Sequence, residues 1–303
     1  MRVFKSEQGR QAVYTSYNKL IQAWDIPVEE RDIDTAYGQT HVIQAGPKTH
    51  PPLLLFHGVG DNSALMWIKN AKALAQHYHF IAVDAIGGAG KSRPDQRYGK
   101  GFDLTTWFNA LLQALKIDKT DLVGVSYGCY LAQHFLITCP DRVGKVVGIA
   151  GYPNVQGYKM GLMKRMMTIF LPVMLWPTEK RIQKLFKTLA GPDADVILAD
   201  KELYRHWRLL LKYFRNDSLR FHKRLAFSPA QYQQVKDRLL FLVGDQDRMA
   251  YFPESMRAIQ ELGLQLQIIP NSGHSVNYDK ATEVNIAILC FLNQKQTAPA
   301  KVG

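Results

Sequence analysis

The stretch DLVGVSYGCYLAQHFLITC, residues 121–139, decides the fold. It opens with the apolar run DLVGV, which is typical of a strand buried on both faces, and it closes with YLAQHFLITC, whose composition favours a helix. Between the two stands GVSYG at 124–128, a G-x-S-x-G sequence in the strand-turn-helix context that this pattern requires. The stretch therefore predicts a buried parallel strand that ends in a sharp turn at Ser126.

Apolar runs of the same kind recur along the chain, and stretches of helical period separate them. The helical stretches lie near residues 64–78, 104–116, 127–138, 254–262 and 281–294. The other apolar runs are THVIQAG (40–46), PLLLFHG (52–58), FIAVDAIG (80–87), KVVGIAGY (145–152), LLFLVGD (239–245) and QLQIIP (265–270). Strands that face water on one side alternate polar and apolar residues, so these continuous runs indicate a mostly parallel twisted sheet with helices on both faces, a doubly wound α/β fold.

Two segments depart from this alternation. Near the N-terminus, SEQGRQAVYTSYNKLIQAW reads as an outlying helix, and residues 151–235 read as several helices in succession. A helical excursion inside an α/β pattern is typical of an insertion over one end of the sheet. We therefore predict a core of residues 1–150 and 236–303 and a helical cap of residues 151–235, called the cap segment below. Its methionine and aromatic side chains either line an apolar substrate pocket or pack the cap onto the core.

The composition is that of an ordinary globular protein. The chain has 303 residues, 47% of them hydrophobic and 21% charged, which excludes a disordered or low-complexity polymer. Its three cysteines form neither a disulfide framework nor a Cys-x-x-Cys metal pair, and no stretch has the ~20 apolar residues of a membrane span. The first residues, MRVFKSEQGRQAVYTSYNKL, contain no apolar run of signal-peptide length, so we expect a cytoplasmic protein without stable membrane association.

The net charge of +12 is concentrated in the cap segment. Residues 151–235 contain 15 Lys or Arg against 6 Asp or Glu and so carry a net charge of +9. Basic residues at helical spacing usually form a solvated face, and binding of nucleic acid or of an anionic membrane is the competing hypothesis. We expect no nucleic-acid partner, and the sequence carries no signal that sets the oligomeric state.

A serine hydroxyl is a weak nucleophile near neutral pH, so a catalytic Ser126 requires a histidine base and a carboxylate that orients this base. Both residue types follow later in the chain, each directly after an apolar run and hence at the carboxyl edge of the sheet where Ser126 also lies. The run LLFLVG leads into Asp245 and Asp247, and QLQIIP leads into His274. Asp247 stands further out on its loop and is freer to turn toward His274, so we favour it over Asp245, which suits a turn or cap role.

Acyl transfer also needs hydrogen-bond donors for the oxygen that becomes negative. In a G-x-S-x-G turn one donor is the backbone N–H after the nucleophile, here Tyr127, and the second comes from the loop after an early strand. The sequence HGVG at 57–60 ends the run PLLLF, which makes Val59 the natural second donor. The alternative is that HGVG is only a glycine-rich turn.

These features together resemble the α/β-hydrolase superfamily. The resemblance covers the chain on both sides of the cap segment and rests on HGVG (57–60), VDAIGGAGKSRP (83–94), GVSYG (124–128), GDQD (244–247) and Gly273-His274. More narrowly, TAYGQTHVIQAGP, Met66-Trp67 and the capped layout are similar to the bacterial carboxylesterases that include the carboxylesterase NP group. In that family the acid matches the fourth position of G-x-x-D, here Asp247, although the DRMAYFP stretch after it departs from the family's spacing.

The resemblance implies a serine hydrolase that cleaves carboxylic esters of small to medium apolar or aromatic acids through an acyl-enzyme, with a small-molecule ester as substrate. No cofactor or metal is expected, because nicotinamide, flavin and zinc patterns are missing and IGGAGKS departs from the P-loop pattern at Ala85. Thioesterase, lactonase, acyltransferase and carbon–carbon bond hydrolase activities use the same apparatus and stay open. A non-catalytic scaffold for ligand sensing is the remaining alternative.

Overall fold

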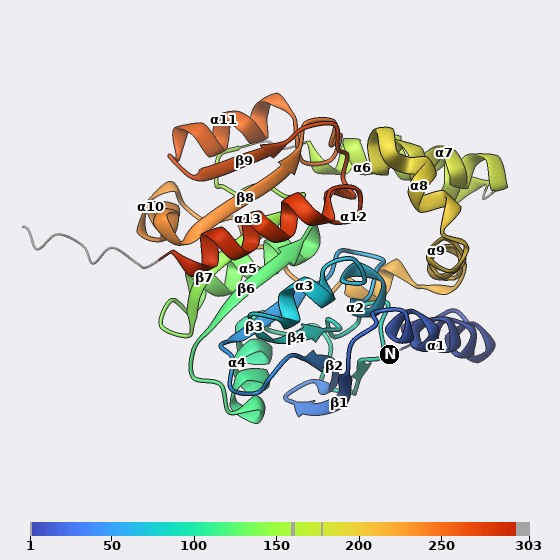
Figure 1. Ribbon diagram of the computed structural model, residues 1–303, viewed down its shortest axis with the longest axis horizontal. Helices are drawn as coiled ribbons and strands as arrows, with labels where there is room; N and C mark the ends of the chain where they lie inside the picture. The colour runs from blue at the N-terminus through green and yellow to red at the C-terminus, as the bar shows by residue number, and fades with distance from the viewer. Residues whose placement is uncertain (1, 159–160, 177, 295–303) are drawn as a thin grey trace, which may run out of the picture.

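The chain folds around one twisted sheet (Figure 1). The structure is a computed structural model, and it describes residues 2–158, 161–176 and 178–294. Within these residues the sheet has nine strands in the order β1-β2-β4-β3-β6-β7-β8-β9, with the short β5 paired to β2. From β4 to β9 along this order the neighbours run parallel, whereas β2 pairs antiparallel with β1, β4 and β5. The predicted mostly parallel α/β sheet is confirmed. The strands are β1 (Val28–Thr35), β2 (Gly38–Ala45), β3 (Pro52–Phe56), β4 (His79–Val83), β5 (Arg93–Pro94), β6 (Thr120–Val125), β7 (Val143–Ile149), β8 (Leu239–Gly244) and β9 (Gln265–Ile269).

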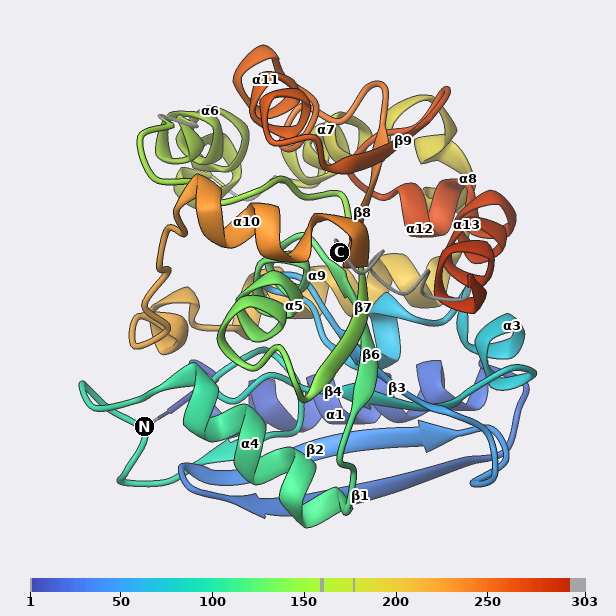
Figure 2. The same cartoon turned by 90° about the vertical axis from the view of Figure 1, so that its left-hand side faces the viewer.

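Helices cover both faces of the sheet (Figure 2). One face packs against α4, α5, α10 and α11, and the other packs against α1, α3 and α13. Along β3 the fully buried Leu54 and Phe56 belong to the first layer and Leu53 and Leu55 to the second, which explains why PLLLF is apolar at successive positions. The helices are α1 (Glu7–Gln22), α2 (Ser63–Met66), α3 (Ala71–Ala75), α4 (Leu104–Leu115), α5 (Tyr127–Thr138), α6 (Leu162–Leu175), α7 (Glu179–Ala190), α8 (Ala194–Ala199), α9 (Lys201–Tyr213), α10 (Pro229–Val235), α11 (Pro253–Glu261), α12 (Val276–Asp279) and α13 (Ala281–Asn293).

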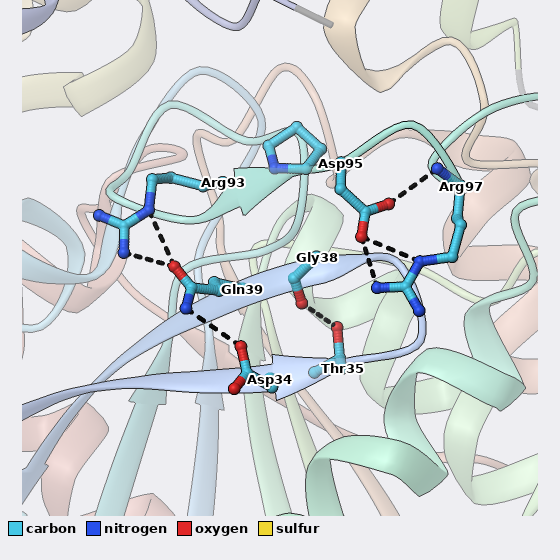
Figure 3. Close-up of a pocket in the computed structure, with 8 residues that line it drawn as sticks. Asp34, Thr35, Gly38, Gln39, Arg93, Asp95 and Arg97 are labelled. Carbon is cyan, nitrogen blue, oxygen red and sulfur yellow. Dashed lines mark hydrogen bonds and ion pairs between the residues drawn. The ribbon is translucent and has the colours of Figure 1, made fainter.

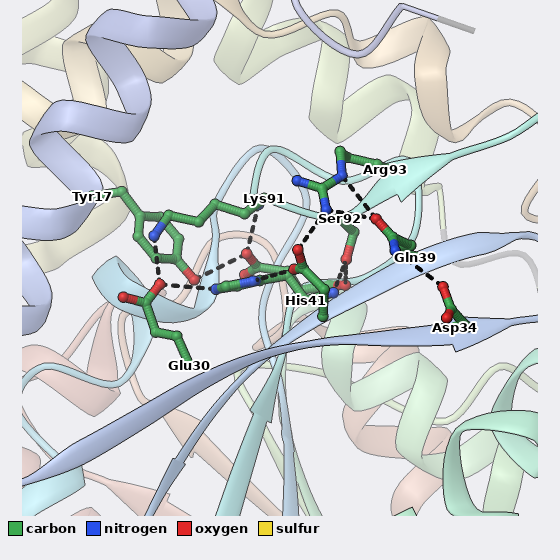
Figure 4. Close-up of polar contacts among 10 residues, drawn as sticks. Tyr17, Glu30, Asp34, Gln39, His41, Lys91, Ser92 and Arg93 are labelled. Carbon is green, nitrogen blue, oxygen red and sulfur yellow. Dashed lines mark hydrogen bonds and ion pairs between the residues drawn. The ribbon is translucent and has the colours of Figure 1, made fainter. Parts of the chain in front are cut away.

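The antiparallel edge of the sheet carries an ionic cluster around the buried His41, drawn in Figure 4. His41 of β2 places Nδ1 2.8 Å from Asp32 and Nε2 3.0 Å from Glu30, both on β1. Lys91 also contacts Glu30. Burial alone would lower the pKa of His41, but the surrounding carboxylates, Glu30 foremost, raise it. Because ionised carboxylates only accept hydrogen bonds, both ring nitrogens donate, and His41 joins the strands as an imidazolium.

The cap segment supplies α6 to α10 between β7 and β8. Helices α6 to α9 pack on one another through small apolar clusters, whereas α10 packs on the sheet. Trp207 of α9 packs on Phe186 of α7 with ring centroids 4.3 Å apart, whereas Met167 and Trp176 are 45% and 60% exposed. Some of its large side chains therefore pack the helices together and others face solvent. The division into core and cap, and an apolar pocket beneath the cap, stay predictions.

The N-terminal helix α1 is not outlying, contrary to the expectation from its sequence. It lies along α9 of the cap segment, as Figure 1 shows. Gly9 sits so close to the ring of Tyr213 that a Cβ there would come within 2.4 Å of it, and the backbone N–H of Lys5 donates to the Tyr213 carbonyl at 2.8 Å. Further along α1, Tyr17 is buried, and its hydroxyl donates to Asp84 at 2.9 Å. None of the helices in the described part of the chain combines the length and hydropathy needed to cross a membrane.

Candidate active site

Ser126 lies at the sharp turn between β6 and α5. Its backbone has φ +55° and ψ −109°, a conformation that is strained for a residue with a Cβ and that is common at active sites. The turn requires glycine on both sides: a Cβ on Gly124 would come within 2.0 Å of the Gly128 carbonyl oxygen, and a Cβ on Gly128 within 2.0 Å of the Phe56 carbonyl oxygen. The GVSYG sequence thus lets the helix cross close to the strands.

His274 and Asp247 reach Ser126 from two neighbouring strands. Asp247 follows β8 and His274 follows β9, so the two loops leave the same carboxyl edge of the parallel sheet as β6. The Nε2 atom of His274 lies 3.0 Å from Ser126 Oγ, and its Nδ1 atom lies 3.0 and 2.9 Å from the two Asp247 oxygens. Nδ1–H therefore donates to the carboxylate, which leaves Nε2 to accept the hydroxyl proton of Ser126.

Asp247 is fixed by its own loop. Its carboxylate is buried and accepts from the backbone N–H groups of Met249 at 2.7 Å and Ala250 at 3.0 Å. Asp245 is placed differently, since its carboxylate accepts from the backbone N–H of Ser272 at 3.2 Å and so joins the two loops. Of the two aspartates that the sequence offered, the structure brings Asp247 to His274.

The environment of His274 favours its protonated form. Burial opposes a charge on the imidazole, but the carboxylate of Asp247 and, more weakly, that of Asp61 raise the pKa of His274 above its ordinary value. The gain in basicity suits a group that must take a proton from a serine. Asp61, which directly follows HGVG, was not singled out from the sequence, because its neighbour His274 lies far along the chain.

The loop after β3 also lies beside Ser126, since a Cβ on Gly58 would stand 3.5 Å from Ser126 Cβ. Val59 lies on this loop with its side chain 37% exposed, and Tyr127 is the first residue of α5, whose backbone N–H has no acceptor within the helix. His57 stabilises the loop: Nδ1–H donates to the Gly58 carbonyl at 2.8 Å, and Nε2 accepts from the backbone N–H of Ala85 at 3.0 Å. This arrangement keeps His57 neutral and structural.

Two cavities lie near the sheet but differ in their relation to Ser126. The first, of about 520 Å³, is polar and lies at the end of the β1–β2 hairpin, far in the sheet order from β6 (Figure 3); it is lined by Asp34, Thr35, Gly38, Gln39, Arg93, Pro94, Asp95 and Arg97. The second, of about 870 Å³, is an open groove between α7 and the loop after β8 that borders Asp247.

Among the described residues, no three His, Cys, Asp or Glu side chains are arranged to hold a metal ion.

Several known proteins are similar to this chain in sequence or in architecture. Residues 51–281 match the sequence profile described as the alpha/beta hydrolase fold. Carboxylesterase YbfK of Bacillus subtilis is 25% identical over 291 residues, which cover 92% of this chain and 93% of that protein. A 2-hydroxy-6-oxononadienedioate/2-hydroxy-6-oxononatrienedioate hydrolase of Dechloromonas aromatica is 25% identical over 280 residues, or 88% of this chain and 94% of that protein. The crystal structure of naproxen esterase (carboxylesterase NP) from Bacillus subtilis matches with a TM-score of 0.80 at 22% identity, covering 95% of this chain and 100% of that chain, a likeness of fold.

Proposed function

Because this chain belongs to the α/β-hydrolase family and is a serine hydrolase of the carboxylesterase kind, we propose that it cleaves esters of small to medium apolar or aromatic acids through an acyl-enzyme on Ser126. The observation that carries the proposal is the continuous series of contacts from Ser126 Oγ through the His274 ring to the Asp247 carboxylate, at 2.9 to 3.0 Å. The name naproxen esterase refers to an ester of naproxen, an aromatic carboxylic acid, and this supports the preference for aromatic acids.

The proposed reaction has two halves. His274 Nε2 takes the hydroxyl proton as Ser126 Oγ attacks the ester carbonyl, and the resulting oxyanion accepts hydrogen bonds from the backbone N–H groups of Val59 and Tyr127. The carbon–oxygen bond to the alcohol then breaks, and the alkoxide leaves with the proton from His274. In the second half, His274 takes a proton from water, the hydroxide attacks the acyl-enzyme, and Ser126 recovers its proton as the acid departs.

Asp247 would act by fixing the tautomer of His274. A hydrogen bond from Nδ1–H to a buried carboxylate holds the ring in the orientation that directs Nε2 at Ser126, and it stabilises the imidazolium that forms in both halves. The backbone donors of Met249 and Ala250 hold the carboxylate in place. We assign residues 151–235 as the cap that encloses the substrate and residues 1–150 with 236–303 as the catalytic core.

Labelling with a fluorophosphonate tests the nucleophile. Intact-mass measurement should show one adduct on the wild-type protein, none on Ser126→Ala, and one on Ser228→Ala, a matched control whose serine caps α10. The wild-type protein should also hydrolyse p-nitrophenyl butyrate. An unlabelled wild type, or an adduct that persists on Ser126→Ala at the same site, would contradict the assignment.

Carbon–carbon bond hydrolysis is the second candidate, since the hydrolase of Dechloromonas aromatica resembles this chain over most of its length. Such a reaction needs a substrate that carries an enol and a vinylogous keto group in place of an ester. Assaying the wild-type protein with a 2-hydroxy-6-oxo-dienoate beside p-nitrophenyl butyrate decides between the two. A kcat/KM that is larger for the dienoate would favour the second candidate.

A further inference from the structure

We propose that Asp61 is a specificity-determining residue that binds an ammonium group of the ester substrate. The inference rests on the proposed ester hydrolysis at Ser126 and adds the chemical class of the substrate. Asp61 stands two residues after Val59, on the loop that lies beside the nucleophile.

The carboxylate of Asp61 lies near Ser126. A Cβ built on Gly58 would stand 3.5 Å from Ser126 Cβ and 3.6 Å from Asp61 Oδ2. The two distances together place Asp61 Oδ2 within about 7 Å of Ser126 Cβ. An ester bound to Ser126 would therefore have its acyl or alcohol substituent within reach of this oxygen.

This carboxylate has no hydrogen-bond or ion-pair partner in the part of the chain that the structure describes. Among the described residues, no hydrogen-bond donor and no cation pairs with Asp61, although its side chain is half-buried. The two ionisable groups whose pKa Asp61 raises make their hydrogen bonds elsewhere: His274 donates to Asp247, and the Tyr278 hydroxyl donates to the Leu65 carbonyl at 2.7 Å.

Removing an ionised carboxylate from water without giving it a hydrogen-bond donor costs free energy. A ligand that supplies a charged donor reduces this cost. Burial raises the pKa of Asp61 to about 7, against the opposing influence of His274. Above that pH the site holds an unpaired negative charge beside the reacting atoms. An ammonium group both donates a hydrogen bond and compensates this charge, whereas an alkyl group of the same shape does neither.

Two isosteric pairs of esters test the inference at about pH 8, where the Asp61 carboxyl is ionised. One pair varies the alcohol: 2-(dimethylamino)ethyl butyrate against 3-methylbutyl butyrate. The other varies the acid: ethyl 4-(dimethylamino)butyrate against ethyl 5-methylhexanoate. In at least one pair, kcat/KM should be tenfold or more larger for the amine ester, about the effect of a hydrogen bond between charged groups.

The ratio within a pair, rather than either rate, is the readout, because it cancels general effects on catalysis. Asp61→Asn and Asp61→Ser should bring the ratio to within about threefold of one. Asp118→Asn, which removes the same charge from an exposed position between α4 and β6, should leave the ratio unchanged.

The outcomes separate this inference from the proposed function. Ratios near one in both pairs for the wild-type protein overturn the inference while ester hydrolysis stands. A ratio that survives both substitutions, with kcat lowered on amine and neutral esters alike, also overturns it and makes Asp61 a positioning residue for His274. If neither ester of either pair is hydrolysed, the proposed function itself fails.

Discussion

The backbone N–H of His274 donates a hydrogen bond to the carbonyl oxygen of Leu189, at 2.5 Å. Leu189 lies in the last turn of α7, so a helix of the cap segment holds the loop that carries the histidine. Gly273 makes this approach feasible, because a Cβ there would come within 2.3 Å of the same carbonyl oxygen. The position of His274 thus depends on the cap segment as well as on β9.

Gly273→Ala should lower kcat by tenfold or more. The added methyl group collides with backbone of α7 and so displaces either the helix or His274, and overpacking of this kind costs about 1–3 kcal/mol. Steady-state kinetics and urea unfolding measure the two effects. Gly99→Ala is the control, since a Cβ there meets no atom within 4 Å; equal kcat for both variants would show that the contact with α7 is dispensable.

Asp247→Asn should lower kcat by about 10⁴, because the amide stabilises the wrong tautomer of His274. Asp245→Asn, two residues earlier, should have a much smaller effect, since its carboxylate contacts the backbone of Ser272 and not the imidazole. Both variants are to be checked for folding by circular dichroism and assayed with p-nitrophenyl butyrate. The reverse ranking would transfer the role of the acid to Asp245.

His41→Gln should destabilise the protein most at low pH. The pKa of His41 is raised in the folded protein, so its imidazolium contributes stability that is fully present below its unfolded pKa of about 6.5 and is lost as the pH rises through the folded pKa. Urea unfolding should give a difference from wild type of about 1 kcal/mol or more at pH 6, as expected for hydrogen bonds to charged groups. The difference should shrink as the pH rises toward 9; one that grows instead would mean that His41 is neutral in the fold.

Ester chain length tests the predicted pocket under the cap segment. Butyryl and octanoyl esters should be hydrolysed with a larger kcat/KM than acetyl esters, because each buried CH₂ contributes about 0.8 kcal/mol, or nearly fourfold. Palmitoyl esters should gain nothing further, since we predict an enclosed pocket and not a lipid-binding surface. A flat profile, or activity that appears only above the critical micelle concentration, would argue against that pocket.

The strands that flank the site were predictable because they are buried on both faces. PLLLF, DLVGV and LLFLVG are apolar at nearly every position, and this separates them from helices and from edge strands. The strand β1 was missed for the opposite reason. VEERDIDT lies at the edge of the sheet with most of its residues exposed, so its charged residues give no apolar run that would predict a strand. Its carboxylates Glu30 and Asp32 are explained by His41, Lys91 and Arg93, which the fold brings beside them.

Contacts between distant segments account for the remaining differences. The helical stretch expected near 64–78 is two short helices, and Asn70 between them donates to Asn285 of α13 at 2.8 Å. Ser126, Asp247 and His274 come together as expected, because each follows a strand whose carboxyl end lies at one edge. Asp61 could be recognised only once His274 and Tyr278 had been placed beside it.

The packing of α1 on α9 sets a rule for building chimaeras from this protein. A cap segment taken from a relative would bring its own α9 and would have to pack on the α1 of this protein. Gly9 would then face a residue other than Tyr213, the side chain on which it packs here. The bridge between Phe4 and Phe214 would be lost with it. The unit that can be exchanged therefore consists of two separate segments of the chain. The N-terminal helix and the cap segment have to be taken from the same donor protein.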